Sequence, residues 1–320
     1  MTQSLYGTAR QRAAWRMAEE FRQRHSHGNM WRTLRREDIA NNLGVRVYDP
    51  SQIDQSRTNL CGIASFVRHW SADNPEDYVR FAINLYEKGA ARLGRIKVQR
   101  NIVPSPELRG DIAPRGMPHA DWLVLASIRE NFNDIFDYRS IESPEMSGLG
   151  EQISAINFPA DVVLGLRTVG YQRIIERTSI SRGQGIANAL EASRYFSQGW
   201  RVILLIHSNM LTRFQNRSAR MPIVRSDHWV GLLSTISTSV DQRYVYPFRV
   251  FTWGREQVVP AGRTVTTSRS PRRSDRSGTA PDTRRNDHFD DIPIDDTPAS
   301  EGLAMQDFVD HYYGFIAAKY

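Results

Sequence analysis

The stretch that decides the fold of this chain is Gln55-Ser56-Arg57-Thr58-Asn59-Leu60-Cys61-Gly62-Ile63-Ala64-Ser65. Cys61 is the only cysteine among the 320 residues, and a small residue follows it. The apolar spacing from Cys61 to Trp70 predicts a helix that begins at the cysteine. A thiol at a helix N-terminus feels the partial positive charge of the unpaired N–H groups, which favours the thiolate. The stretch therefore marks Cys61 as a candidate nucleophile.

A second group of residues, far downstream, supplies a candidate base. His228 opens the apolar run His228–Leu233, and a further predicted strand ends in Thr252-Trp253-Gly254. Histidine titrates near neutral pH, so it is the side chain suited to accept a thiol proton. Gln55, six residues before the cysteine, carries an amide that could stabilise an oxyanion. Cysteine, histidine and amide together indicate nucleophilic catalysis.

This arrangement resembles the active site of papain-like cysteine peptidases, and in particular the bacterial effector or toxin members of that superfamily. The resemblance rests on Gln55 and Cys61 at the start of a helix, on His228 at the start of a strand, and on Trp253-Gly254 after the next strand. It implies that Cys61 is the nucleophile, that His228 is the base, and that Gln55 is an oxyanion donor beside the backbone N–H of Cys61. Asn59 is a competing oxyanion donor.

The third catalytic residue departs from the family pattern. Papain-like enzymes usually carry Asn or Asp two residues before the tryptophan of the Trp-Gly pair, and this chain has Phe251 there. Thr252 is the nearest polar side chain, and its hydroxyl could accept a hydrogen bond from the imidazole. A Cys–His dyad, or an aspartate from elsewhere such as Asp241, is the alternative. The predicted catalytic residues are therefore Cys61, His228, Gln55 and Thr252.

The order of the predicted elements gives an α+β fold. Helices dominate the first half of the chain and strands the second, because helical spacing of apolar residues is found over 8–25, 33–43, 61–70, 75–88, 118–131, 159–168 and 184–198. A strand over 200–207 and a hairpin of 228–235 with 244–253 follow. The papain-like resemblance implies a helical lobe that carries the Cys61 helix and an antiparallel β lobe that carries His228.

Two boundary signals refine these helices. Gly44 follows the helix over 33–43, and glycine is typical of the residue just after a helix. Asn74 and Pro75 mark the start of the helix over 75–88: Asn74 is expected as its N-cap and Pro75 as its first residue.

Composition divides the chain into four parts. Residues 1–45 are expected to be a basic helical extension, residues 46–260 the papain-like domain, residues 261–302 a disordered charged insert, and residues 303–320 a C-terminal helix that packs on the catalytic domain. The insert has few large apolar residues and carries its charges in blocks, which is typical of disorder. The tail is different, since its apolar residues recur at helical spacing.

Charge, cysteine content and the length of the apolar runs argue against several classes of protein. The net charge is +7, but no zinc-finger spacing or RNA-binding signature accompanies it, so nucleic-acid binding is not predicted. A single cysteine excludes an internal disulfide, and the longest aliphatic run, Val202–Ile206, is too short for a membrane span. Only three of the 42 basic residues are lysine, which fits either a GC-rich genome or a protein delivered into a eukaryotic cell.

The sequence thus predicts a cysteine-dependent hydrolase, a peptidase or amidase that works through an acyl-enzyme on a protein or peptide-like substrate. The alternatives are a thiol acyltransferase or deamidase on the same site and a non-catalytic papain-like binding module. No cofactor or metal site is predicted. The resemblance also implies a virulence effector or toxin, made in the bacterial cytoplasm without a Sec signal and exported by a dedicated secretion system into a target cell. A secretion chaperone and an immunity protein are the partners that such a toxin implies.

Overall fold

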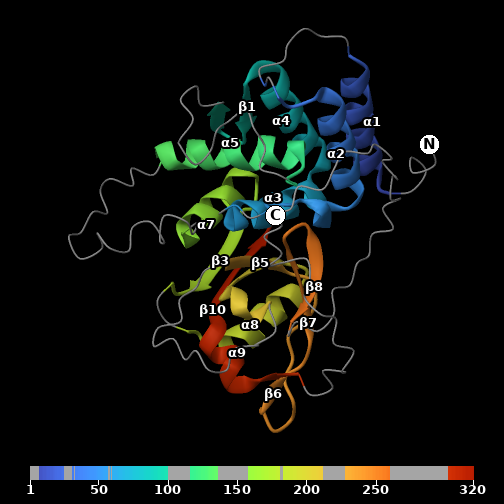
Figure 1. The fold of residues 1–320 in the computed structure, drawn as a ribbon. Coiled ribbons are helices and arrows are strands. Elements are labelled where there is room, and N and C mark those ends of the chain that lie inside the picture. The colour runs from blue at the N-terminus through green and yellow to red at the C-terminus, as the bar shows by residue number, and fades with distance from the viewer. Residues whose placement is uncertain are drawn as a thin grey trace, which may run out of the picture.

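A computed structural model of the chain describes residues 7–24, 31, 33–56, 58, 60–99, 116–135, 158–180, 183–211, 228–259 and 302–320. A helical lobe lies on one side of an antiparallel sheet, and α3 lies between the two (Figure 1). The helices are α1 (Ala9–Gln23), α2 (Arg36–Tyr48), α3 (Cys61–Asp73), α4 (Pro75–Lys88), α5 (His119–Ile135), α7 (Pro159–Thr168), α8 (Ile186–Ser197) and α9 (Met305–His311), with the short 3-10 turns η2 (Pro50–Gln52) and η5 (Ser208–Met210).

The main sheet has six strands, and every neighbouring pair is antiparallel. Their spatial order is β3 (Arg173–Thr178), β10 (Tyr312–Lys319), β4 (Arg201–Ile206), β5 (His228–Leu232), β7 (Phe248–Thr252) and β8 (Arg255–Val259). Two small sheets pair β1 (Ala90–Leu93) with β2 (Ile96–Gln99) and β6 (Tyr244–Val245) with β9 (Leu303–Ala304). The expected α+β class, with His228 on an antiparallel sheet, is therefore confirmed.

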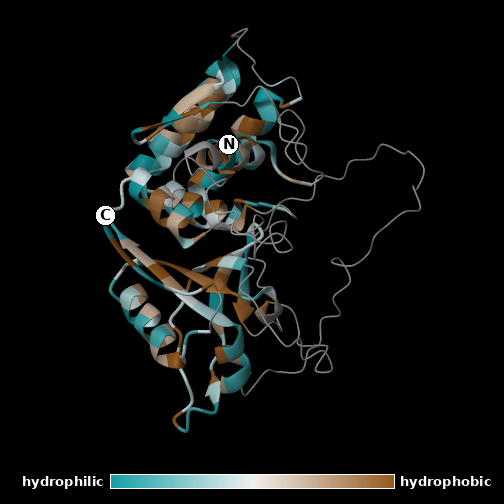
Figure 2. Ribbon diagram, turned by 90° about the vertical axis from the view of Figure 1, so that its left-hand side faces the viewer, coloured by the Kyte–Doolittle hydropathy of each residue, from teal (hydrophilic) through white to brown (hydrophobic). Residues whose placement is uncertain are grey.

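The central strands of the six-stranded sheet, β10, β4 and β5, are covered on both faces. Residues of one parity, such as Ile203 and Trp229, join the core beneath the helical lobe, and the alternate residues, such as Val202 and Val230, pack toward α8. Figure 2 shows the apolar strands between these two layers. Because both faces of β10, β4 and β5 are buried, these strands are nearly continuous apolar runs rather than alternating ones.

Most predicted elements are confirmed with shifted ends. The helices over 8–25, 61–70, 75–88, 118–131, 159–168 and 184–198 and the strand over 200–207 correspond to α1, α3, α4, α5, α7, α8 and β4. β5 pairs with β7 as the hairpin requires, but Tyr244–Val245 leaves that arm to pair with β9. The strands β1, β2, β3 and β8 were not predicted. Within the described part of the chain, no helix has the length and apolar character that a membrane crossing needs.

The second helix continues past its predicted end. Gly44 lies inside α2, which reaches Tyr48. A Cβ at Gly44 would be in ordinary contact with Trp15 of α1, at 3.7 Å, so this glycine is a helical residue at a helix–helix contact and not a terminator. The boundary predicted between residues 45 and 46 also falls inside α2. Ala14 and Phe21 of α1 share a core cluster with residues of α2, so α1 packs as part of the helical lobe.

The C-terminal segment differs most from the expectation. A helix over 303–320 was predicted, but only α9 is helical there, and β10 is a strand between β3 and β4. Residues 312–318 are all buried. A strand covered on both faces carries apolar residues at every position, and periodicity alone does not distinguish it from a buried helix. The tail does pack into the core, as expected. The predicted charged insert lies, except for Gly302, outside the described residues.

Candidate active site

Cys61 is the first residue of α3, and its side chain is buried. Leu60 occupies the N-cap position and has no side-chain hydrogen bond to the helix. The N–H groups of a first helical turn have no partner within the helix, and they favour negative charge close to them. The predicted place of Cys61 at a helix N-terminus is therefore confirmed.

Side-chain to backbone hydrogen bonds fix the segment that carries Gln55, which we call the Gln55 turn (Asp54, Gln55, Ser56 and Thr58). The carbonyl of Gln55 accepts hydrogen bonds from the backbone N–H and the hydroxyl of Thr58, at 3.2 and 2.6 Å. The carboxylate of Asp54 accepts the N–H of Ser56 at 2.7 Å, and Ser56 has a positive φ of 52°. The side chain of Gln55 is buried. The turn before Cys61 thus has a defined conformation.

The imidazole of His228 is held by two neighbours. His228 Nε2 lies 2.5 Å from Thr252 Oγ1, and the ring of Trp253 stacks on the imidazole with centroids 4.7 Å apart. His228 begins β5 and Thr252 ends β7, so the pairing of these two strands brings the side chains together. Asp241, the alternative partner, is exposed and binds Ser239 and Arg243 instead.

The turn after Thr252 has a strained backbone. Trp253 and Gly254 have φ of 47° and 67° and connect β7 to β8. Positive φ at both positions matches a type I′ turn, which favours Asn-Gly. A bulky residue in this region costs on the order of 1–3 kcal/mol and persists only where its surroundings hold it. Here the stack on His228 is one such contact, so the strain is found where the candidate base is positioned.

The Trp253-Gly254 turn touches the Gln55 turn. A Cβ at Gly254 would lie only 2.7 Å from the Cβ of Asp54, so glycine is required for this close approach. Because Trp253 stacks on His228, this contact brings the candidate base and the candidate oxyanion donor to the same junction between the helical lobe and the sheet.

The strand that begins with His228 also packs along α3. Gly231 lies opposite His69, whose Nε2 would be 3.5 Å from a Cβ at that glycine. His69 follows Cys61 by about 12 Å along the helix, and Gly231 follows His228 by about 10 Å along the strand. These matching spans, together with the contact at Gly254, indicate that the Cys61 end of α3 faces the His228 end of β5.

Strand parity restricts how His228 would reach the thiol. Trp229 and Gly231 face α3, whereas Val230 faces the opposite side of the sheet. His228 has the parity of Val230. A contact between the imidazole and Cys61 would therefore form at the end of β5, where the chain enters the sheet, and not across the face on which α3 packs.

Besides His228, a histidine on α3, His69, is a possible base, but its surroundings do not suit that role. His69 is buried, and its Nδ1 lies 3.2 Å from Nη1 of Arg68. Burial, together with the charges of Arg68 and Arg201, lowers the pKa of His69 well below its usual value. Burial also lowers the pKa of Arg68 to about 10, which leaves it charged at neutral pH. His69 is therefore a neutral core residue that accepts a hydrogen bond from Arg68.

No protein-family model, curated protein or solved structure matches this chain. Among the described residues, no cluster of three or more His, Cys, Asp or Glu side chains could hold a metal ion. Asn59, the competing oxyanion donor, lies outside the described residues. The functional assignment therefore depends on the geometry of Cys61, Gln55, His228 and Thr252.

Proposed function

We propose that this chain is a cysteine-dependent hydrolase of papain-like type, in which Cys61 is the nucleophile and His228 the general base. The observation that supports this most strongly is the 2.5 Å contact between His228 Nε2 and Thr252 Oγ1, beneath the ring of Trp253. Because Thr252 engages Nε2, the other ring nitrogen, Nδ1, is the one that takes the thiol proton. An oriented imidazole and a cysteine at a helix start are the elements that nucleophilic catalysis requires.

The reaction proceeds through an acyl-enzyme. His228 accepts the thiol proton, and the sulfur of Cys61 forms a bond to the substrate carbonyl carbon as the carbonyl electron pair moves to oxygen. The amide of Gln55 and the backbone N–H of Cys61 donate hydrogen bonds to this oxyanion. When the oxyanion collapses, the bond to the leaving amine breaks and His228 returns its proton to that amine. Water then attacks the thioester with His228 as base, releasing the carboxylic acid and the thiol.

Thr252 has a limited role in this scheme. A threonine hydroxyl fixes the tautomer and the orientation of the imidazole, but it is neutral and does not offset the charge of the imidazolium as a carboxylate would. The substrate is a protein or a peptide-like amide, and the arginine-rich, lysine-poor chain fits a bacterial effector toxin exported to a target cell.

Acylation by p-nitrophenyl acetate tests this proposal without knowledge of the natural substrate. The thiol displaces p-nitrophenolate, whose release is followed by absorbance, and mass spectrometry locates the acetyl group. We expect an acetyl group on Cys61, no reaction with Cys61→Ala, and a loss of roughly 10²–10⁴-fold with His228→Ala. Thr252→Ala should lose less, and the controls His311→Ala and Thr178→Ala should react as the unmodified chain does. Equal p-nitrophenolate release with and without Cys61 would contradict the proposal and favour a binding module.

A further inference from the structure

A fully buried ion pair lies in the helical lobe. Arg46 of α2 donates from Nε and Nη2 to the two carboxylate oxygens of Asp121 on α5, at 3.1 and 2.7 Å. Only 5% of Arg46 and 1% of Asp121 is exposed. Burial raises the pKa of Asp121 above its usual value, although the charge and hydrogen bonds of Arg46 oppose that effect. The guanidinium and the carboxylate thus form a bidentate ion pair that is shielded from water.

The carboxylate accepts a third hydrogen bond, which connects it to the candidate site. Asp121 Oδ2 also accepts the backbone N–H of Asp54, at 2.9 Å. Asp54 directly precedes Gln55, caps the N–H of Ser56, and touches Gly254 of the β7–β8 turn. The buried pair thus holds the backbone at the first residue of the Gln55 turn.

Stability alone gives a weak reason for such a pair. The desolvation of two charges is comparable to their attraction, and apolar residues of similar volume often replace a buried ion pair without loss of stability. Apolar residues, however, could not accept the N–H of Asp54. The distinctive property of this pair is that it places a charged acceptor against one backbone amide beside Gln55.

We propose that Arg46 and Asp121 are positioning residues, which hold the Gln55 turn so that the Gln55 amide meets the oxyanion. This inference rests on the proposed function. Arg46 fixes the carboxylate, the carboxylate fixes the N–H of Asp54, and the Gln55 turn follows. The pair therefore acts only in steps that pass through an oxyanion, and it has no part in forming the thiolate of Cys61.

Two thiol reagents separate this role from a merely structural one. p-Nitrophenyl acetate acylates Cys61 through a tetrahedral oxyanion. Iodoacetamide instead alkylates the thiolate by displacing iodide from a saturated carbon, and no oxyanion forms. We expect Asp121→Asn to slow acylation roughly 10- to 100-fold, the usual consequence of a small misplacement in a site. The same variant should leave the rate and the pH dependence of alkylation unchanged.

A matched control and an apolar replacement separate positioning from folding. Asp161 is another buried aspartate that accepts a backbone N–H, from Phe158 at 2.9 Å, and Asp161→Asn should leave both reactions unchanged. The double variant Arg46→Met with Asp121→Leu removes the charges together, so it keeps the fold even if Asp121→Asn does not. It should show the same loss of acylation. Thermal melting establishes that each variant is folded at the assay temperature.

A double-mutant cycle with Gln55→Ala decides whether the pair acts through Gln55. If it does, Asp121→Asn adds no further loss once Gln55 is alanine. Equal slowing of acylation and alkylation, unchanged acylation, or a full additive loss in the Gln55→Ala background would each overturn the inference while leaving the proposed function intact. No acylation of the unmodified chain would overturn both.

Discussion

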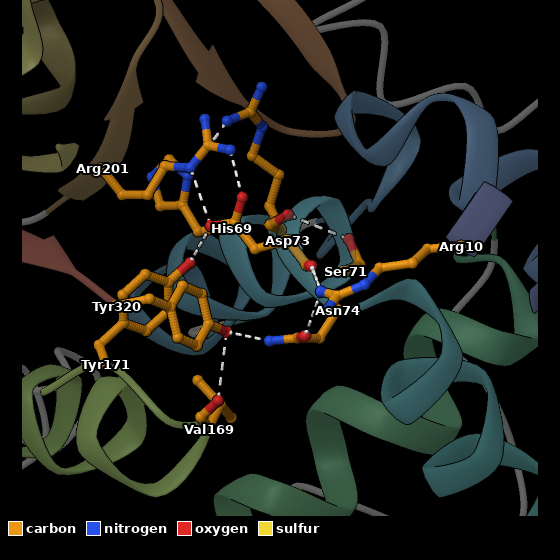
Figure 3. Close-up of polar contacts among 10 residues, drawn as sticks. Arg10, His69, Ser71, Asp73, Asn74, Val169, Tyr171, Arg201 and Tyr320 are labelled. Carbon is orange, nitrogen blue, oxygen red and sulfur yellow. Dashed lines mark hydrogen bonds and ion pairs between the residues drawn. The ribbon is translucent and has the colours of Figure 1, made fainter. Parts of the chain in front are cut away.

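The two ends of α3 meet the sheet through different kinds of side chain. At the Cys61 end, the candidate site consists of an amide, an imidazole held by a hydroxyl, and a stacked indole. At the other end, a charged group dominates, in what we call the Asp73 cluster (Asp73, Asn74, Tyr171, Arg201 and Tyr320; Figure 3). Arg201 of β4 donates from Nε and Nη2 to the carboxylate of Asp73, the Nε bond being 2.9 Å long, and Tyr171 donates to it at 2.6 Å.

The Asp73 cluster also attaches Tyr320, the residue that follows β10, to the helical lobe. Asn74 donates to the hydroxyl of Tyr320 at 2.6 Å, and the rings of Tyr171 and Tyr320 lie 4.1 Å apart. Burial raises the pKa of Tyr171, and it raises the pKa of Tyr320 to about 12, so both hydroxyls keep their protons at neutral pH. Both tyrosines therefore remain hydrogen-bonding members of this anchor at neutral pH.

The difference shows how one helix can serve both stability and reactivity. The thirteen residues of α3 separate its two ends by about 18 Å, and at that distance the opposite charges of Asp73 and Arg201 largely cancel. The ion pair can hold the helix on the sheet without acting on the proton equilibrium of the thiol. The comparison predicts that changes at one end alter stability and that changes at the other alter reactivity.

The largest effect on stability is expected from Asp73→Ala. This change removes three hydrogen bonds to the carboxylate, two from Arg201 and one from Tyr171. It should lower the free energy of unfolding by about 2–3 kcal/mol, since hydrogen bonds to charged groups contribute the most. Urea unfolding measures the loss. Asp77→Ala, which breaks an exposed pair with Arg80, is the control and should cost well under about 1 kcal/mol.

The rate of Cys61 alkylation separates the two ends in the same variant. With Asp73→Ala, the rate should remain unchanged at a temperature where the chain is folded. A slower alkylation in the folded variant would show that the two ends are coupled and would end the comparison.

A smaller, pH-dependent effect is expected from His69. Because its pKa is lowered in the folded state, the unfolded chain binds a proton first as the pH falls below about 6.5. Stability is therefore fully present above that pH and decreases by about 1.4 kcal/mol for each pH unit below it. His69→Gln should flatten this part of the profile of unfolding free energy against pH. If the variant shows the same slope as the unmodified chain, His69 binds a proton as readily in the folded chain as in the unfolded one, which would contradict the lowered pKa.

Local patterns predicted the parts of this molecule that local forces decide. The helix that begins at Cys61 and the helix after Pro75 follow from spacing and from termination signals. Asn74 illustrates the limit, since it occupies the N-cap position but its side chain binds Tyr320, 246 residues away in sequence, and also accepts from Arg10. A cap is a local prediction, whereas a side chain's choice among several partners depends on the tertiary fold.

The candidate site shows the same division. The sequence points to Thr252 because it lies next to Trp253, and the pairing of β5 with β7 does bring its hydroxyl to His228. Asp121 was not singled out, because it lies 67 residues from Asp54 and looks like an ordinary acidic residue in the first turn of a helix. The only sequence signal that could mark Asp121 is its place within the otherwise apolar stretch from Ala120 to Ala126.

The most direct test of the central claim is the rate of alkylation of Cys61 by iodoacetamide as a function of pH. Cys61 is the only thiol of the chain, so the reaction reports on this site alone. If His228 activates Cys61, the midpoint of the rate-against-pH curve should lie well below about 8.5, the pKa of a free thiol. The variant His228→Ala should move that midpoint to higher pH. A midpoint near that of a free thiol, unchanged by His228→Ala, would contradict the account and show that Cys61 is not a nucleophile.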